Sequence, residues 1–131
     1  MILRRVAALL LISILICGFG PLYKDPVKLT EADSGKTIEM KIGDCLNIVL
    51  EGNPTTGYIW EESSRTAPYL KQYKRQDFIP QSRLIGAGGK CTFHYKAAAK
   101  GTKELKLVYH RPWEKKVPPL KVFNVKVKVK L

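Results

Sequence analysis

The sequence predicts an all-β sandwich of about seven short strands joined by Greek-key connections. Two observations carry this prediction. Apolar and polar residues alternate with a period of two in several segments, and clusters of Gly, Pro and Asn separate those segments at near-regular spacing. The chain has 131 residues, of which 45% are hydrophobic and 26% charged, a size and composition that suit one hydrophobic core.

Seven segments have the pattern of a strand, and the last one is the clearest because four valine or phenylalanine positions alternate with lysine and asparagine. Trp60 falls in the third segment and is expected in the core. Residues 63–76 show no regular period, and we expect irregular chain there with a turn of helix near 69–73. The seven segments lie at residues 37–42, 46–51, 58–60, 78–79, 91–95, 103–109 and 123–131.

The N-terminal residues have the pattern of an export signal. Arg4 and Arg5 precede the apolar run 6–16, which at about eleven residues is too short to span a bilayer comfortably. We therefore predict a signal peptide at residues 1–20 and an exported protein, located in a periplasm, outside the cell or in the secretory lumen. Cys17 resembles a lipoprotein acceptor, so lipid attachment and membrane anchoring at Cys17 stay open as an alternative. Residues 21–33 are expected to be a loose lead-in to a domain at 34–131.

The sequence lacks the short motifs of several classes of metal and catalytic site. No C-x-x-C pair or H-E-x-x-H motif is present, so no metal site is expected. The phosphate-binding loop and the nucleophile elbow are also absent, which disfavours an enzyme and leaves no cofactor expected. Loss of the signal leaves Cys45 and Cys91, which can form one disulfide or remain separate thiols.

Basic residues are in excess, with 23 Lys and Arg against 11 Asp and Glu, a formal net charge of +12. Lys126, Lys128 and Lys130 alternate along the last strand and are expected on a solvated face. The export signal argues against a nucleic-acid partner, since a basic nucleic-acid-binding barrel needs no export. Steering toward an acidic protein or an anionic membrane stays open.

Three loops hold the residue types of a recognition surface. The segment 53–58 (Asn-Pro-Thr-Thr-Gly-Tyr) follows the second strand, 84–89 (Leu-Ile-Gly-Ala-Gly-Gly) precedes the fifth, and 111–113 (Arg-Pro-Trp) follows the sixth. In a Greek-key sandwich such connections can emerge at one end. Proline stiffens a loop, glycine permits close approach of a partner, and Arg and Trp are enriched in binding hot spots.

Trp60 follows the first motif, Phe93 follows the second, and Tyr109-His110 leads into the third. Together these three motifs, in this order, resemble the chagasin family of inhibitors of papain-like cysteine proteases. The resemblance runs from about Ser34 to the C-terminus and implies an immunoglobulin-like β-sandwich that acts as a monomer. It implies that the protein performs no reaction and occludes the active-site cleft of a protease reversibly and tightly. The residues implied to bind the protease are Asn53, Pro54, Thr55, Thr56, Gly57, Tyr58, Leu84, Gly86, Ala87, Gly88, Gly89, Arg111, Pro112 and Trp113.

The resemblance also implies a role for each loop. Thr55, Thr56 and Gly57 would lie nearest the catalytic cysteine and histidine of the protease, and the glycine-rich loop would run along its substrate cleft. Trp113 would pack on an aromatic surface of the protease, and Arg111 would supply charge-assisted hydrogen bonds. The alternative is a secreted sandwich for adhesion or assembly without inhibitory activity, which would leave the three loop motifs unexplained.

Overall fold

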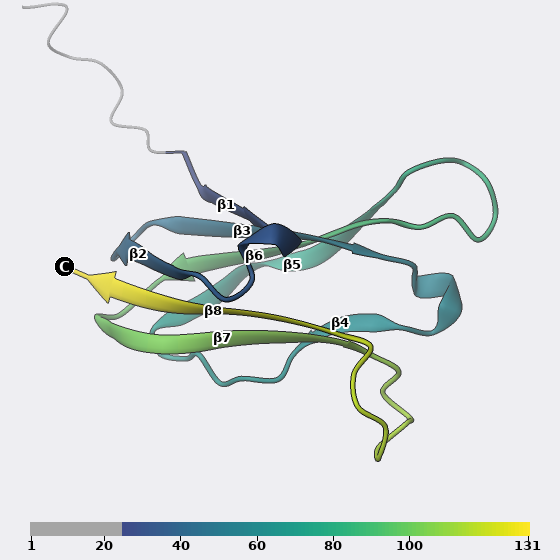
Figure 1. The fold of residues 1–131 in the computed structure, drawn as a ribbon. Helices are drawn as coiled ribbons and strands as arrows, with labels where there is room; N and C mark the ends of the chain where they lie inside the picture. Colours follow the sequence, from purple (N-terminus) through teal and green to yellow (C-terminus); the bar gives the residue numbers. More distant parts are fainter. Residues whose placement is uncertain (1–24) are drawn as a thin grey trace, which may run out of the picture.

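The computed structural model describes residues 25–131, which form two four-stranded sheets packed face to face (Figure 1). The first sheet has the order β1-β3-β6-β5, with β1 at Val27–Thr30, β3 at Cys45–Gly52, β6 at Gly89–Ala97 and β5 at Leu70–Pro80. The second has the order β2-β8-β7-β4, with β2 at Thr37–Lys41, β8 at Lys121–Lys130, β7 at Gly101–His110 and β4 at Ile59–Glu62. Short 3-10 helices follow β1 (η1, Glu31–Asp33) and β3 (η2, Pro54–Thr56).

The core lies between the sheets and is filled by every second residue of the inner strands. Leu46, Ile48 and Leu50 of β3 are fully buried, and β8 supplies Phe123 and three valines from the opposite sheet. Burying each such side chain stabilises the fold by about 1.5–3 kcal/mol, so this alternation holds the two layers together. Trp60 is 3% exposed, as the sequence predicts, and its indole N–H donates to the Glu51 carbonyl at 3.0 Å. The all-β sandwich is thereby confirmed.

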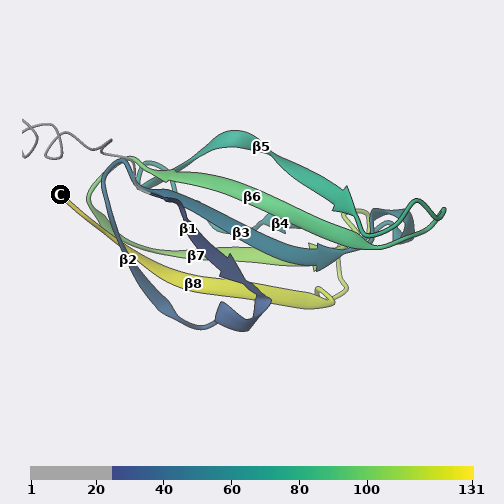
Figure 2. The ribbon, with the colours of Figure 1, turned by 90° about the horizontal axis from the view of Figure 1, so that it is seen from above.

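Strand pairing is mostly antiparallel, with two parallel pairs at the sheet edges, β1 with β3 and β2 with β8. The chain leaves the first sheet after β3, returns to it at β5 and leaves again after β6. Consequently the connections β3–β4, β5–β6 and β7–β8 all emerge at one end of the sandwich, away from the C-terminus (Figures 1 and 2).

The expectation of irregular chain at 63–76 is wrong from Leu70 onward. Residues 70–80 form β5, an edge strand that pairs with β6, and no helical turn occurs at 69–73. Only Leu70 on this strand is buried, and the pairing is interrupted by irregularities between Gln72 and Lys74 and between Lys74 and Asp77. Because β5 exposes residues on both faces and bulges twice, the period of two is lost from its sequence. The predicted strand at 78–79 is the end of β5, so β1 alone raises the number of strands within residues 25–131 from the seven predicted to eight.

The lead-in expected at 21–33 contains part of the sandwich. Val27–Thr30 form β1, which pairs with the first half of β3 and buries Leu29. The fold therefore begins before Ser34. The predicted signal peptide and the lipid acceptor Cys17 lie outside the described residues.

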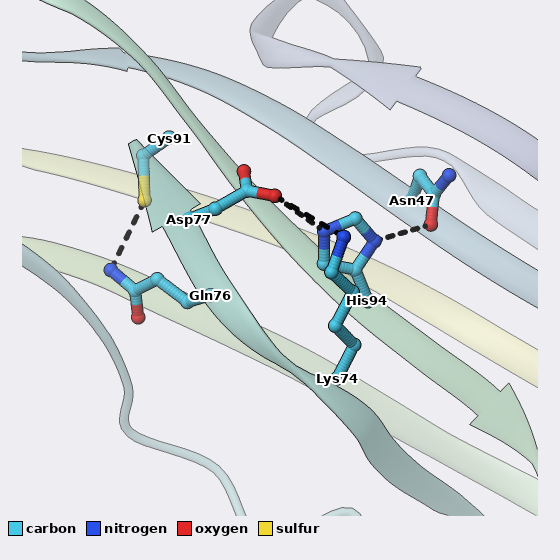
Figure 3. A network of polar contacts seen from close by, with 6 residues as sticks. All are labelled: Asn47, Lys74, Gln76, Asp77, Cys91 and His94. Atoms are coloured by element: carbon cyan, nitrogen blue, oxygen red, sulfur yellow. Dashed lines mark hydrogen bonds and ion pairs between the residues drawn. The ribbon is translucent and has the colours of Figure 1, made fainter. Parts of the chain in front are cut away.

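The disulfide considered between Cys45 and Cys91 does not form, and both are free cysteines. Strand register explains why, because Cys45 lies opposite Lys96 whereas Cys91 lies opposite Leu50. The two cysteines are thus separated by about 17 Å along neighbouring strands, far beyond disulfide range. Cys91 lies on the core side, where its sulfur accepts a hydrogen bond from the Gln76 side-chain amide at 3.1 Å (Figure 3).

Candidate functional site

The end of the sandwich away from the C-terminus is built by three loops, which we call the tip (Figures 1 and 2). The first loop, residues 53–58, joins β3 to β4. The second, residues 81–88, joins β5 to β6, and the third, residues 111–120, joins β7 to β8. The structure therefore brings the three sequence motifs together, as their place in a Greek-key sandwich predicts.

The first loop is a single 3-10 turn with both ends capped. The Asn53 side-chain oxygen accepts from the backbone N–H of Thr55 at 3.1 Å and from its hydroxyl at 2.6 Å, which caps the N-terminus of η2. Pro54 occupies the first turn, where its missing N–H costs nothing. The Thr56 hydroxyl donates to the Asn53 carbonyl at 2.6 Å, and Gly57 ends the turn with φ +85°, a conformation that favours glycine. These contacts hold the loop in one shape.

Asn53 also joins the first loop to the second loop and to the core. Its side-chain NH₂ donates to the Gly86 carbonyl at 2.9 Å, and its backbone N–H donates to the Tyr109 hydroxyl at 2.8 Å. The Tyr109 ring is buried and packs against Trp60 and Tyr58, with ring centroids 5.1 and 5.3 Å away. One asparagine thus ties two loops to an aromatic cluster at the base of the tip.

The third loop is fastened to the first by Arg111 and Trp113. The Arg111 Nε–H donates to the Thr56 carbonyl at 3.2 Å, and the guanidinium lies 4.5 Å from the centre of the Tyr58 ring, a cation–π geometry. Arg111 also pairs with Glu114 at 3.3 Å, while the Trp113 ring lies over Gly57. The Arg111 guanidinium, which the resemblance implies would bind a protease, therefore makes most of its contacts within the tip.

Apolar side chains project from the tip into solvent. Leu84 is 79% exposed, Ile85 is fully exposed and Trp113 is 65% exposed. Pro112 is exposed as well, and Ala87 and Gly88 are half-buried in the second loop. Large exposed apolar groups gathered at one end of a small domain are typical of a protein-binding surface.

Gly89 is the one predicted binding residue that does not lie on this surface. It belongs to β6 and is buried, and a Cβ atom there would collide with the backbone of Ile79 and Pro80. Its role is to let β5 and β6 approach each other. Two residues that the predicted set of binding residues lacks also shape the tip, since Tyr109 accepts the Asn53 backbone N–H and Glu114 pairs with Arg111. Tyr109 stands in the third motif that carries the family resemblance, whereas the sequence signal for Glu114 is its closeness to Trp113.

The tip combines a capped turn in the first loop with exposed apolar side chains on the second and third loops. Within residues 25–131, no three His, Cys, Asp or Glu side chains gather closely enough to hold a metal ion. Over the same range there is no helix of the length and hydrophobicity that crossing a membrane would require.

Comparison with known proteins agrees with this geometry. The family described as chagasin family peptidase inhibitor I42 matches residues 39–127. Chagasin of Trypanosoma cruzi is 38% identical over 90 residues, which cover 66% of this chain and 82% of chagasin. Amoebiasin-1 of Entamoeba histolytica is 33% identical over 104 residues, 79% of this chain and 99% of the relative.

A solved structure extends the likeness to the fold. The crystal structure of a cysteine protease inhibitor from Entamoeba histolytica superposes with a TM-score of 0.74 at 28% identity, and the match covers 85% of this chain and all of the other. The family match spans most of the described sandwich, including all three loop motifs. The chain belongs to the chagasin family of peptidase inhibitors.

Proposed function

We propose that this protein is a reversible, tight-binding inhibitor of papain-like cysteine proteases that occludes the active-site cleft with its three loops. The observation that carries the proposal is the interlocked tip, in which Asn53 and Arg111 bind the second and third loops to the first. A relative named as a cysteine protease inhibitor, with the same fold, supports the class of target. The family's description as peptidase inhibitors supports the activity.

The first loop has the chemistry to face a thiolate and imidazolium pair without being cut. The Thr55 and Thr56 hydroxyls donate their protons inside the loop. The Thr55 oxygen, and the Thr56 lone pair that the Tyr58 backbone N–H does not use, remain available as acceptors for a protonated histidine. Proteases bind substrates in extended form, whereas this segment is a closed 3-10 turn whose Thr56 carbonyl already accepts from Arg111. The carbonyls of Asn53, Pro54 and Thr56 already accept hydrogen bonds within the tip, which disfavours their presentation to a nucleophile.

The other two loops would contact the cleft on either side. The glycines of the second loop allow its backbone to approach the partner closely, and Leu84 and Ile85 offer apolar contact. In the third loop, Trp113 has the size and exposure of a hot-spot side chain. An interface of standard size buries about 1,600 Å² in total, and loops that are already ordered lose little entropy on binding.

From the sequence, we also propose that the protein is exported and acts as a monomer. Arg4 and Arg5 followed by the apolar run 6–16 support export, and Cys17 is the candidate for lipid anchoring. A monomer suffices for the mechanism, because one chain supplies all three loops.

The experiment is titration of a chain that begins at Pro21 into papain with a fluorogenic peptide substrate. All eight strands and the core described here lie within residues 25–131, so this chain keeps the sandwich. We expect stoichiometric inhibition that dilution reverses, with the inhibitor recovered uncut by mass spectrometry. Absence of inhibition of papain and its relatives would favour the adhesion or assembly alternative.

Two variants test the loops separately. Trp113→Ala should weaken inhibition about 30-fold, the usual cost of losing a hot-spot side chain, with unchanged thermal unfolding. Thr56→Trp should block insertion of the first loop, and Thr102→Trp, at an exposed position of β7 outside the tip, is the matched control. Full potency of Thr56→Trp would show that the first loop does not enter the cleft.

A further inference from the structure

The outer face of the first sheet carries a lysine cluster at the end remote from the tip. Lys71 of β5 lies directly opposite Lys96 of β6. The next row across the sheet runs from Lys28 through Asn47 and His94 to Lys74. We call Lys28, Lys71, Lys74 and Lys96 the lysine cluster, and all four side chains are exposed.

This arrangement is electrostatically unfavourable in the isolated protein. Like charges directly opposite in an antiparallel pair destabilise a sheet, and Lys71 and Lys96 form such a pair. Among residues 25–131, Lys28, Lys71 and Lys96 take part in none of the ion pairs observed. An external anion would therefore relieve repulsion that the fold leaves uncompensated.

Carboxylates near the cluster are few: Asp77 and Asp44 are already engaged, and Asp25 is exposed three residues before Lys28. Asp77 contacts His94 at 3.2 Å and Lys74 at 3.8 Å through the same oxygen (Figure 3). Asp44, in the turn before β3, accepts the backbone N–H of Lys41 at 2.9 Å. The cluster thus keeps an excess of positive charge.

The second sheet offers an instructive contrast because its lysines have acidic neighbours. Lys128 lies opposite Glu39, and Lys126 lies opposite Glu104, while Lys130 lies opposite Lys41 but has Glu39 within reach. Glu39 also forms an ion pair with Lys130 at 3.2 Å. The alternating lysines of β8 therefore behave as a compensated, solvated face, and the cluster on the first sheet does not.

The position of the cluster indicates what kind of anion it meets. Lys28 lies in β1, directly after the described chain begins at Asp25, and the far end of the sandwich holds the starts of β3 and β5 and the end of β6 (Figures 1 and 2). Cys17, the candidate lipid acceptor, precedes Asp25 by eight residues, which reach at most about 28 Å. A lipid there would tether this end of the sandwich within that distance of a membrane.

We propose that the lysine cluster docks on an anionic membrane surface by binding the phosphates of its lipid headgroups. One lipid chain alone gives marginal attachment, and a basic patch is the usual second signal. Tyr73 lies on β5 next to Lys74 and is 49% exposed, and a tyrosine ring suits the boundary between headgroups and acyl chains. This inference does not depend on the proposed inhibition.

The test uses the chain from Pro21, which lacks both the apolar segment and Cys17, in sedimentation with lipid vesicles. We expect binding to vesicles that contain phosphatidylglycerol, no binding to pure phosphatidylcholine vesicles, and a decrease of binding as NaCl is raised. Equal binding to both vesicles, or to neither, would overturn the proposal. Binding to DNA or heparin without binding to anionic vesicles would also overturn it, in favour of a different polyanion.

Two double variants distinguish the effect of the lysine cluster on vesicle binding from the effect of the protein's net charge. Lys71→Gln with Lys96→Gln should weaken vesicle binding about 30-fold, whereas Lys126→Gln with Lys128→Gln, which removes the same charge from the other sheet, should change it little. Equal losses would show that only net charge matters. Inorganic phosphate that displaced the protein at millimolar concentration would indicate a site for free phosphate instead of a membrane face.

Papain inhibition by vesicle-bound protein tests the orientation. We expect the same potency on and off anionic vesicles, because the tip lies at the other end of the sandwich. Loss of inhibition on vesicles, with inhibition in solution intact, would show that the tip faces the lipid and would contradict the proposed docking face.

Discussion

The ring of Trp113 lies so closely over Gly57 that a Cβ atom placed on Gly57 would stand 2.5 Å from it. Gly57 also has φ +85°, so two independent constraints exclude a side chain at this position. The glycine ends the first loop and the tryptophan projects from the third. The orientation of the exposed indole is consequently set by a residue of another loop.

Gly57→Ala should therefore reduce inhibition strongly by moving Trp113. The left-handed conformation costs alanine about 1–2 kcal/mol, and the displaced indole should raise the inhibition constant for papain about 30-fold. Gly35→Ala is the matched control, since Gly35 has φ +89° and no atom within 4 Å of an added Cβ. Both variants should lose similar thermal stability, and equal potency of the two would refute the coupling.

Asn53→Ala should loosen the first loop from the second. The substitution removes the bonds to Thr55 and to the Gly86 carbonyl, and loss of a helix cap alone costs about 1 kcal/mol. We expect a roughly 10-fold weaker inhibitor, measured by titration against papain. Asn124→Ala removes side-chain contacts with Ser34 and Glu104 outside the tip and should leave potency unchanged.

The free energy of unfolding should fall at alkaline pH because of Tyr95. Burial raises the pKa of its hydroxyl well above the ordinary value, and the hydrogen bond that it donates to Glu62 at 2.7 Å raises it further. Below about pH 10 both folded and unfolded chains keep this proton. Above that pH the unfolded chain releases the proton while the folded chain retains it, so stability falls by up to about 1.4 kcal/mol per pH unit.

Urea unfolding at several pH values checks this expectation. Tyr95→Phe should be less stable at neutral pH, because Glu62 loses the shortest of its hydrogen bonds, and should show a shallower decline above about pH 10. An unchanged slope would mean that Tyr95 ionises equally in both states.

The two cysteines should differ sharply in reactivity. Cys91 is 5% exposed and burial raises the pKa of its thiol, whereas Cys45 is half-buried at the outer face of β3. In the chain from Pro21, iodoacetamide should label Cys45 in the native state and Cys91 only after unfolding. Cys45→Ser should abolish the native labelling. A need for reductant before any labelling would instead reveal a disulfide.

Strands with one buried face could be predicted from the sequence. In β3, β7 and β8 the core side takes every second residue, so the alternation of Leu46, Ile48 and Leu50 directly records burial. The tip could be located as well, because proline, glycine and asparagine must occupy its turns.

Features that depend on pairing across the sheets could not be predicted. β5 lies at an edge with both faces in solvent, so its sequence carries no periodic signal. The separation of Cys45 from Cys91 depends on the register between β3 and β6, which neither strand encodes alone. The engagement of Arg111 with Tyr58 and Thr56 likewise joins residues more than fifty positions apart.

The place of the chain ends has a practical consequence. Leu131 and the beginning of β1 lie at the end of the sandwich away from the three loops (Figures 1 and 2). A fluorophore, an affinity tag or a solid support attached at the C-terminus would leave the loops accessible. Immobilised in this way, the protein would serve as a capture reagent that withdraws active thiol proteases from a mixture and releases them unmodified.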